Sequence, residues 1–169
     1  MIVVDSREKK WEHIKTYFDR SGVLYKDKVR LDAGDYFNTE YPYVVVDRKN
    51  SLQEICTNLT FGKDNYHRFV RECRRAYQRH IKLIVLIEGT SCKTMDDVVE
   101  WKSKFSNHTG HWLRTEMKRI SYMYGVEWQF CTKKQTAARI LEITHYEHRR
   151  NKSNGHNGGR VADVRNTTE

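Results

Sequence analysis

The segment from Gly34 to Lys49, GDYFNTEYPYVVVDRK, constrains the fold more than any other part of the sequence. Its two halves have the composition of β-strands and flank the only proline, Pro42, so the segment predicts a β-hairpin. The run Val44–Val46 makes the interior of the second strand apolar, which favours a central position in a sheet. A rigid hairpin of this kind is a suitable support for a functional site.

The expected register of this hairpin brings two acidic residues together. With the turn centred on Tyr41, Asp35 lies opposite Asp47, and Lys49 projects from the same face as Asp47. Opposed side chains have Cβ atoms about 5 Å apart, where like charges are destabilising. A cation between the two carboxylates would relieve this, and oxygen ligands suit Mg²⁺. A slip of one residue would place the two carboxylates on opposite faces.

Further charged residues extend this candidate site. The ammonium of Lys49 could orient or deprotonate a water molecule, or neutralise charge that builds on a phosphate. Asp5 and Glu8 form a second acidic group at the end of the first expected strand, where sites in open α/β sheets tend to lie. If that strand neighbours the hairpin, these acids are expected to complete the metal site or to hold a second ion.

Apolar periodicity predicts strands that alternate with helices, and therefore an α/β fold with a mixed sheet. The connections through helices are expected to be parallel and the hairpin antiparallel. The expected strands cover residues 2–4, 23–31, 35–38, 43–49, 82–87 and 126–131, and the expected helices cover 9–20, 63–80, 94–105, 112–124 and 135–149, with a short helix after Ser51. One domain should span residues 1–150, followed by a flexible polar tail over 151–169.

The balance of charge favours a polyanionic partner. The formal net charge of +9 raises the odds of nucleic-acid binding, because contacts with phosphates release counterions. One face of the expected helix 63–80 is basic and would hold the phosphate backbone of DNA, although it could also be an ordinary solvated face. The residues of this face are Arg68, Arg71, Arg75 and Arg79.

Other features of the composition narrow the class of protein. The sequence has no run of 18 apolar residues, so a membrane span is excluded. Its first residues, MIVVDSRE, lack the order of a signal peptide, and its four cysteines are spread singly along the chain. Reduced thiols in a cytoplasmic protein are therefore expected.

Several of these motifs together resemble the XPF-family (ERCC4-type) nuclease domain. They are VDSRE (4–8), GDY (34–36) and VDRK (46–49), followed by the basic helix and by the strand LIVLIEG (83–89). The family belongs to the PD-(D/E)XK superfamily, so the resemblance implies a restriction-endonuclease-like mixed β-sheet flanked by helices. It covers about residues 2–145 in element order, and the chain looks more like the short standalone members from bacteria or phages.

The resemblance also implies an activity. It predicts a DNA endonuclease that uses Mg²⁺ or Mn²⁺, leaves 5′-phosphate ends and acts on branched, flap or duplex DNA. Arg48 would contribute its backbone carbonyl to the metal while its side chain turns away. A homodimer through the helices 112–124 and 135–149 is implied as well. The implied site residues are Asp5, Glu8, Asp35 and Asp47 as metal ligands, together with Arg48 and Lys49.

The sequence departs from the family pattern in three respects. Asp47 stands where the family usually has Glu, and Gln53, followed by Glu54, stands where it often has Asp. The resemblance does not include the tandem helix-hairpin-helix module that often follows, so substrate preference does not carry over.

The sequence also offers two other functions. A non-catalytic DNA-binding or scaffold module of the same fold is the main alternative, although such members lose the acidic pair or the lysine, and this chain keeps all three. An enzyme acting on a small phosphate ester is disfavoured by the extended basic helix and the absence of a Gly-rich phosphate loop.

Overall fold

The computed structural model describes residues 1–147. In this part of the chain, six strands form one mixed sheet in the order β2-β1-β3-β4-β5-β6. β3 is antiparallel to both β1 and β4, and the remaining neighbours are parallel, which confirms the expected α/β architecture. The strands are β1 (Ile2–Asp5), β2 (Tyr25–Val29), β3 (Tyr36–Asn38), β4 (Tyr41–Lys49), β5 (Lys82–Ile87) and β6 (Glu127–Phe130).

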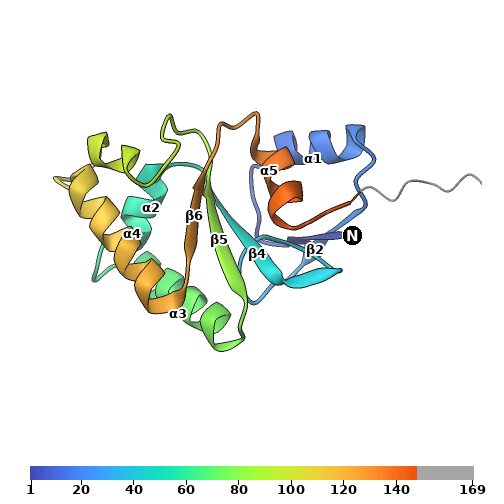
Figure 1. Cartoon of the computed structure of the whole chain (residues 1–169), viewed down its shortest axis with the longest axis horizontal. Coiled ribbons are helices and arrows are strands. Elements are labelled where there is room, and N and C mark those ends of the chain that lie inside the picture. Colours follow the sequence, from blue (N-terminus) through green and yellow to red (C-terminus); the bar gives the residue numbers. More distant parts are fainter. Residues whose placement is uncertain (148–169) are drawn as a thin grey trace, which may run out of the picture.

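Helices cover both faces of the sheet (Figure 1). One face carries α2 (Leu52–Leu59), α3 (Asp64–Gln78) and α4 (Gly110–Tyr124), and the other carries α1 (Glu12–Arg20) and α5 (Thr136–Ile143). Each helical layer packs on its own cluster of buried apolar side chains. Among residues 1–147, no helix is long and apolar enough to cross a membrane.

The neighbouring strands β4 and β5 are buried on both faces. Val45 packs in the cluster beneath α2, α3 and α4, whereas Val46 packs in the cluster beneath α1 and α5. The same alternation separates Val85 from Leu86 on β5. Burial on both faces explains why these strands have continuous apolar runs rather than alternating ones.

The prediction of a helix over residues 94–105 was wrong. Only a short 3-10 turn, η1 (Asp97–Glu100), forms there. The carboxylate of Asp97 accepts hydrogen bonds from the backbone N–H groups of Lys93 and Thr94, which favours a turn over a continuous helix. The backbone of η1 also lies against the start of α4, because a Cβ atom on Gly110 would come within 2.1 Å of the Val98 carbonyl oxygen.

The last helix is shorter than expected. α5 ends at Ile143, and His145 adopts a left-handed backbone conformation with φ of 51°. The buried side chain of Asn38 donates from Nδ2 to the carbonyls of Thr144 (3.1 Å) and His145 (3.2 Å). This cap comes from a distant strand, so the apolar periodicity of the helix gives no sign of it. Residues 148–149 of the expected helix and the expected tail 151–169 lie outside the described residues.

Replacing Asn38 with alanine should lower the free energy of unfolding by about 2 kcal/mol. The variant leaves two carbonyls at the end of α5 without their donor in a largely buried position. Urea denaturation followed by circular dichroism measures the change. The exposed loop residue Asn107 supplies a matched control, since Asn107→Ala should change the stability by less than about 0.5 kcal/mol. Equal effects of the two substitutions would contradict the capping role.

Candidate active site

The hairpin formed by β3 and β4 has the predicted register beside the candidate site. Tyr36 pairs with Val46 and Phe37 pairs with Val45. Asp35 immediately precedes β3, where its N–H donates to the Val46 carbonyl at 2.7 Å and its carboxyl group is close enough to Asp47 to feel the charge of that residue. The turn itself lies at residues 39–40 and not at Tyr41, because a register shift after Phe37 places extra residues in β4. The error in the turn therefore does not reach the acidic pair.

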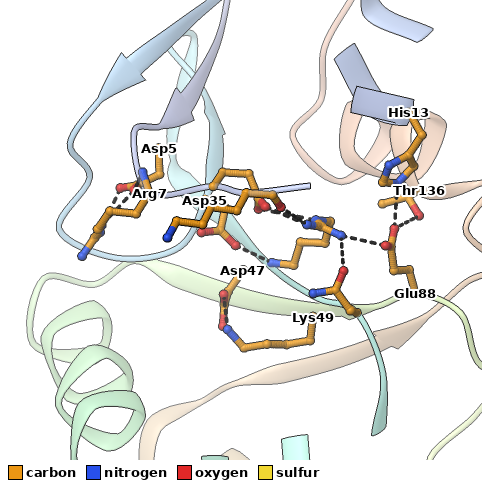
Figure 2. Close-up of polar contacts among 12 residues, drawn as sticks. Asp5, Arg7, His13, Asp35, Asp47, Lys49, Glu88 and Thr136 are labelled. Carbon is orange, nitrogen blue, oxygen red and sulfur yellow. Dashed lines mark hydrogen bonds and ion pairs between the residues drawn. The ribbon is translucent and has the colours of Figure 1, made fainter. Parts of the chain in front are cut away.

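Asp47 and Lys49 form a buried ion pair on the α2–α4 side of the sheet (Figure 2). Lys49 Nζ donates to Asp47 Oδ1 at 2.6 Å, and the two side chains are only 12% and 3% exposed. Asp47 Oδ2 is buried and has no hydrogen-bond partner among the described residues. Although burial disfavours the charged form of Lys49, the carboxylates of Asp47 and Asp35 outweigh it, and the pKa of this ammonium is raised. Lys49 is therefore held as a cation.

Asp35 lies beside this ion pair and carries a strongly perturbed carboxyl group. Its Oδ2 accepts a hydrogen bond of 2.8 Å from the backbone N–H of Arg48 on the opposing strand. Burial, and then the negative charge of Asp47, raise the pKa of Asp35 well above its usual range. Lys49 only partly offsets these effects. Two carboxylates and one ammonium thus share a poorly solvated position, which is typical of functional sites.

Glu72 is a third carboxylate of this group, and the sequence analysis missed it. It projects from α3, and its Oε1 accepts a hydrogen bond of 2.7 Å from the backbone N–H of Gly34. Burial, followed by the charge of Asp47, raises the pKa of Glu72. The available signal was its position as the only acid in the interior of an arginine-rich helix, next to the buried residue Cys73.

Asp5 is buried, and both of its carboxylate oxygens accept hydrogen bonds from neighbouring residues (Figure 2). Its Oδ1 accepts from the backbone N–H (2.6 Å) and Nε (2.8 Å) of Arg7, while Oδ2 accepts from Arg7 Nη2 (2.8 Å) and the Leu31 N–H (2.7 Å). Burial raises the pKa of Asp5, but these contacts outweigh it, so the net pKa is lowered. Asp5 therefore joins β1 to the loop after β2.

Glu8 forms an ion pair with Arg48. The side chain of Arg48 lies in the interior and turns away from Asp47, as expected. Arg48 Nη2 contacts Glu8 Oε1 at 2.6 Å, and Nη1 contacts Glu88 Oε1 at 2.7 Å. Glu88 also contacts His13 and Thr136, which ties α1 and α5 to the sheet (Figure 2). The acidic group expected from Asp5 and Glu8 is thus divided between two separate ion pairs.

The arrangement of acids bears on whether a metal ion could bind. Among residues 1–147, no three His, Cys, Asp or Glu side chains are grouped closely enough to hold a metal. Mg²⁺, however, commonly keeps several waters and needs only one or two carboxylates. The buried Oδ2 of Asp47, which lacks a partner, and the neighbouring carboxylate of Asp35 are hard oxygen donors of the required type. The residues present therefore fit such an ion.

The basic face of α3 divides into two parts. Arg75 donates to the backbone carbonyl of Asp32, and Arg79 pairs with the carboxylate of the same residue. These two arginines therefore hold the turn that precedes Gly34. Arg68 and Arg71 are exposed, and within residues 1–147 only Arg68 has a side-chain hydrogen bond, a long one of 3.4 Å with Asn65.

Gln53, at the position where the resemblance predicts Asp, has a structural contact. Its Oε1 accepts hydrogen bonds from Ser103 Oγ (3.2 Å) and from the backbone N–H of Lys104 (3.1 Å). Glu54 accepts from the backbone N–H of Asn50 at 2.9 Å and so stabilises the start of α2. Neither side chain contacts Asp35, Asp47 or Lys49.

Comparisons with known proteins agree with the fold. The sequence model of the ERCC4 domain matches residues 4–143. The solved structure of XPF from Aeropyrum pernix is similar with a TM-score of 0.63 and 17% identity, over 98% of this chain and 67% of that one. XPF from Aeropyrum pernix in complex with DNA gives a TM-score of 0.60 and 18% identity, over 85% of this chain and 62% of that one. No curated protein matches the sequence significantly.

Proposed function

Because this chain belongs to the ERCC4 domain family, we propose that it is a divalent-metal-dependent DNA endonuclease centred on Asp35, Asp47 and Lys49. The observation that carries the proposal is the buried group of carboxylates around one buried ammonium. Like charges in a poorly solvated position destabilise a fold, and proteins retain them chiefly where chemistry needs them. The net charge of +9 favours a polyanionic substrate.

Each residue of the site has a proposed role. Asp35 and Asp47 would hold Mg²⁺ or Mn²⁺, with Glu72 close by. When bound, such an ion supplies positive charge that polarises the phosphate and makes water a better nucleophile. Lys49, held as a cation, stabilises negative charge on the phosphate and orients the attacking water. Hydrolysis would leave a 5′-phosphate end, as the family resemblance implies.

Asp5, Glu8 and Arg48 are proposed to act by positioning the site. Arg48 fixes Asp35 through its backbone N–H, while its side chain is held by Glu8 and Glu88. Asp5 holds Arg7 beside the same acidic group, since Asp5, Glu72 and Asp35 all act to raise the pKa of that arginine. The carbonyl of Arg48 as a metal ligand and a homodimer through α4 and α5 stay predictions.

Arg71→Ala should weaken DNA binding and lower its salt dependence. Each lost phosphate contact reduces the slope of log K against log salt by about 0.9 on duplex DNA. Fluorescence anisotropy with a labelled duplex in EDTA, at several salt concentrations, measures the slope. Lys15 is exposed on α1, on the other side of the sheet, so Lys15→Ala should leave the slope unchanged. An unchanged slope for Arg71→Ala would remove this face from the proposed DNA-binding surface.

The experiment that tests the proposed function is a cleavage assay on labelled duplex, flap, fork and four-way-junction DNA. Each substrate is incubated with the full chain and Mg²⁺, Mn²⁺ or EDTA. We expect metal-dependent cutting, with at least one branched substrate preferred over plain duplex. Salt-sensitive binding without cutting of any substrate would contradict the proposal and favour a non-catalytic DNA-binding module.

A further inference from the structure

A cavity at the N-terminal end of α3 has no part in the mechanism above. Its volume is about 460 Å³, and it is formed by α2, the start of α3 and the loop before α4. The loop is held against α2 by the two hydrogen bonds that Gln53 Oε1 accepts. Its lining includes Gln53, Asp64, Asn65 and Phe105.

The lining of this pocket combines an aromatic ring with polar groups that are available for a ligand. Phe105 is 83% exposed, although a phenyl ring usually packs in the interior. No hydrogen bond within residues 1–147 uses the Gln53 Nε2, the Asp64 carboxylate or the Asn65 Nδ2. A flat ligand could stack on the ring while it bonds to these donors and this acceptor. The carboxylate of Asp64 suits an exocyclic amino group.

The position of the pocket relates it to a bound DNA strand. α3 carries Asp64 at the pocket and Glu72 at the active site, and eight residues of helix span about 12 Å. The exposed Arg68 and Arg71 lie between them on the same helix. At about 3.4 Å per nucleotide in duplex DNA, this distance corresponds to three or four nucleotides. Lys63 is exposed and belongs to the lining, and its charge would attract the phosphate backbone.

We propose that this pocket receives one unpaired nucleobase of the bound DNA, which stacks on Phe105. The inference rests on the proposed function and adds to it the feature that the substrate must offer. A paired base would first have to leave the duplex at a cost of a few kcal/mol, whereas an unpaired base can enter the pocket without this cost. The protein should therefore select DNA with an unpaired nucleotide about three or four positions from the cut.

The test compares binding of two DNAs that differ in one nucleotide. A labelled duplex and the same duplex with a single unpaired adenine are titrated with the full chain in EDTA. We expect the wild type to bind the second DNA more tightly, and Phe105→Ala to reduce this preference about tenfold, as expected for one lost base–aromatic stack. Phe61 is the matched control, because it is 78% exposed but lies outside the pocket lining. Phe61→Ala should keep the wild-type ratio.

Several outcomes would overturn the proposal. The proposal fails if the wild type binds both DNAs with equal affinity. It also fails if Phe105→Ala leaves the ratio of the two affinities unchanged, or if Phe61→Ala reduces that ratio as much as Phe105→Ala does. Cleavage of the same DNAs with Mg²⁺ separates this failure from that of the proposed function. Metal-dependent cutting without a preference for the unpaired adenine removes the pocket proposal alone. The absence of both binding and cutting on either DNA removes both.

Discussion

Asp47→Asn is expected to lower the rate of DNA cleavage at saturating Mg²⁺ by about a thousandfold. The substitution preserves the shape of the side chain but removes the charge of the proposed ligand whose Oδ2 is buried without a partner. It also replaces the charged acceptor of Lys49 at 2.6 Å with a neutral amide oxygen, so the ammonium is held less strongly. Single-turnover cleavage of the preferred DNA measures the rate, since it isolates the chemical step from product release.

The control for this prediction is Asp96→Asn. Asp96 is an acid at the surface whose side chain is 80% exposed and which pairs with Arg114 outside the proposed site. We expect the control to cut at nearly the wild-type rate. Thermal unfolding of all three proteins excludes loss of the fold as the cause. A folded Asp47→Asn variant that cuts within about tenfold of the wild-type rate would show that Asp47 is not a metal ligand.

Gly34→Ala should lower the free energy of unfolding by about 3 kcal/mol and abolish activity. Gly34 has φ of +65°, a conformation that costs a residue with a Cβ atom about 1–2 kcal/mol. The new Cβ would also lie 2.3 Å from Val45 Cγ1 and 2.9 Å from the Val46 carbonyl oxygen in the central strand. Movement of this turn would displace Asp35 and the hydrogen bond from Gly34 to Glu72. Urea denaturation measures the loss of stability.

Gly22→Ala separates these two causes. Gly22 has nearly the same backbone conformation, with φ of +64°, but nothing lies within 4 Å of the position of its Cβ. The Gly22→Ala variant should therefore lose only the conformational part of the free energy of unfolding, about 1–2 kcal/mol, and should still cleave DNA. If both variants lost the same stability, the close approach of Gly34 to β4 would have no energetic consequence. That result would contradict the packing described for the turn.

The hairpin shows how much of the candidate site could be predicted from the sequence. The facing of Asp35 and Asp47 follows from the two-residue period of a strand and from the need to bury the valines of β4, so an error of the turn did not alter it. Lys49 followed from the same period. The family motifs added Asp5 and Glu8 to this pair, whereas the structure holds these two acids in separate ion pairs with Arg7 and Arg48.

Other parts of the site depend on contacts between distant segments and could not be predicted. Glu72 reaches the site because its carboxylate on α3 accepts the Gly34 N–H just before β3, a contact that helical periodicity does not contain. Likewise, the separation of Asp5 from Glu8 arises because Arg7 and Arg48 each bind one of them. The basic face of α3 was correct as a pattern, but the pattern could not show that Arg75 and Arg79 hold the turn at Asp32.

The central claim, that Asp35 and Asp47 hold a divalent cation, is tested most directly by calorimetric titration of the full chain with Mn²⁺. We predict saturable binding to the wild type and its loss in the double variant Asp35→Asn/Asp47→Asn. Asp96→Asn should bind as the wild type does, because its carboxylate lies at the surface outside the proposed site. Undiminished Mn²⁺ binding by the folded double variant would contradict the account.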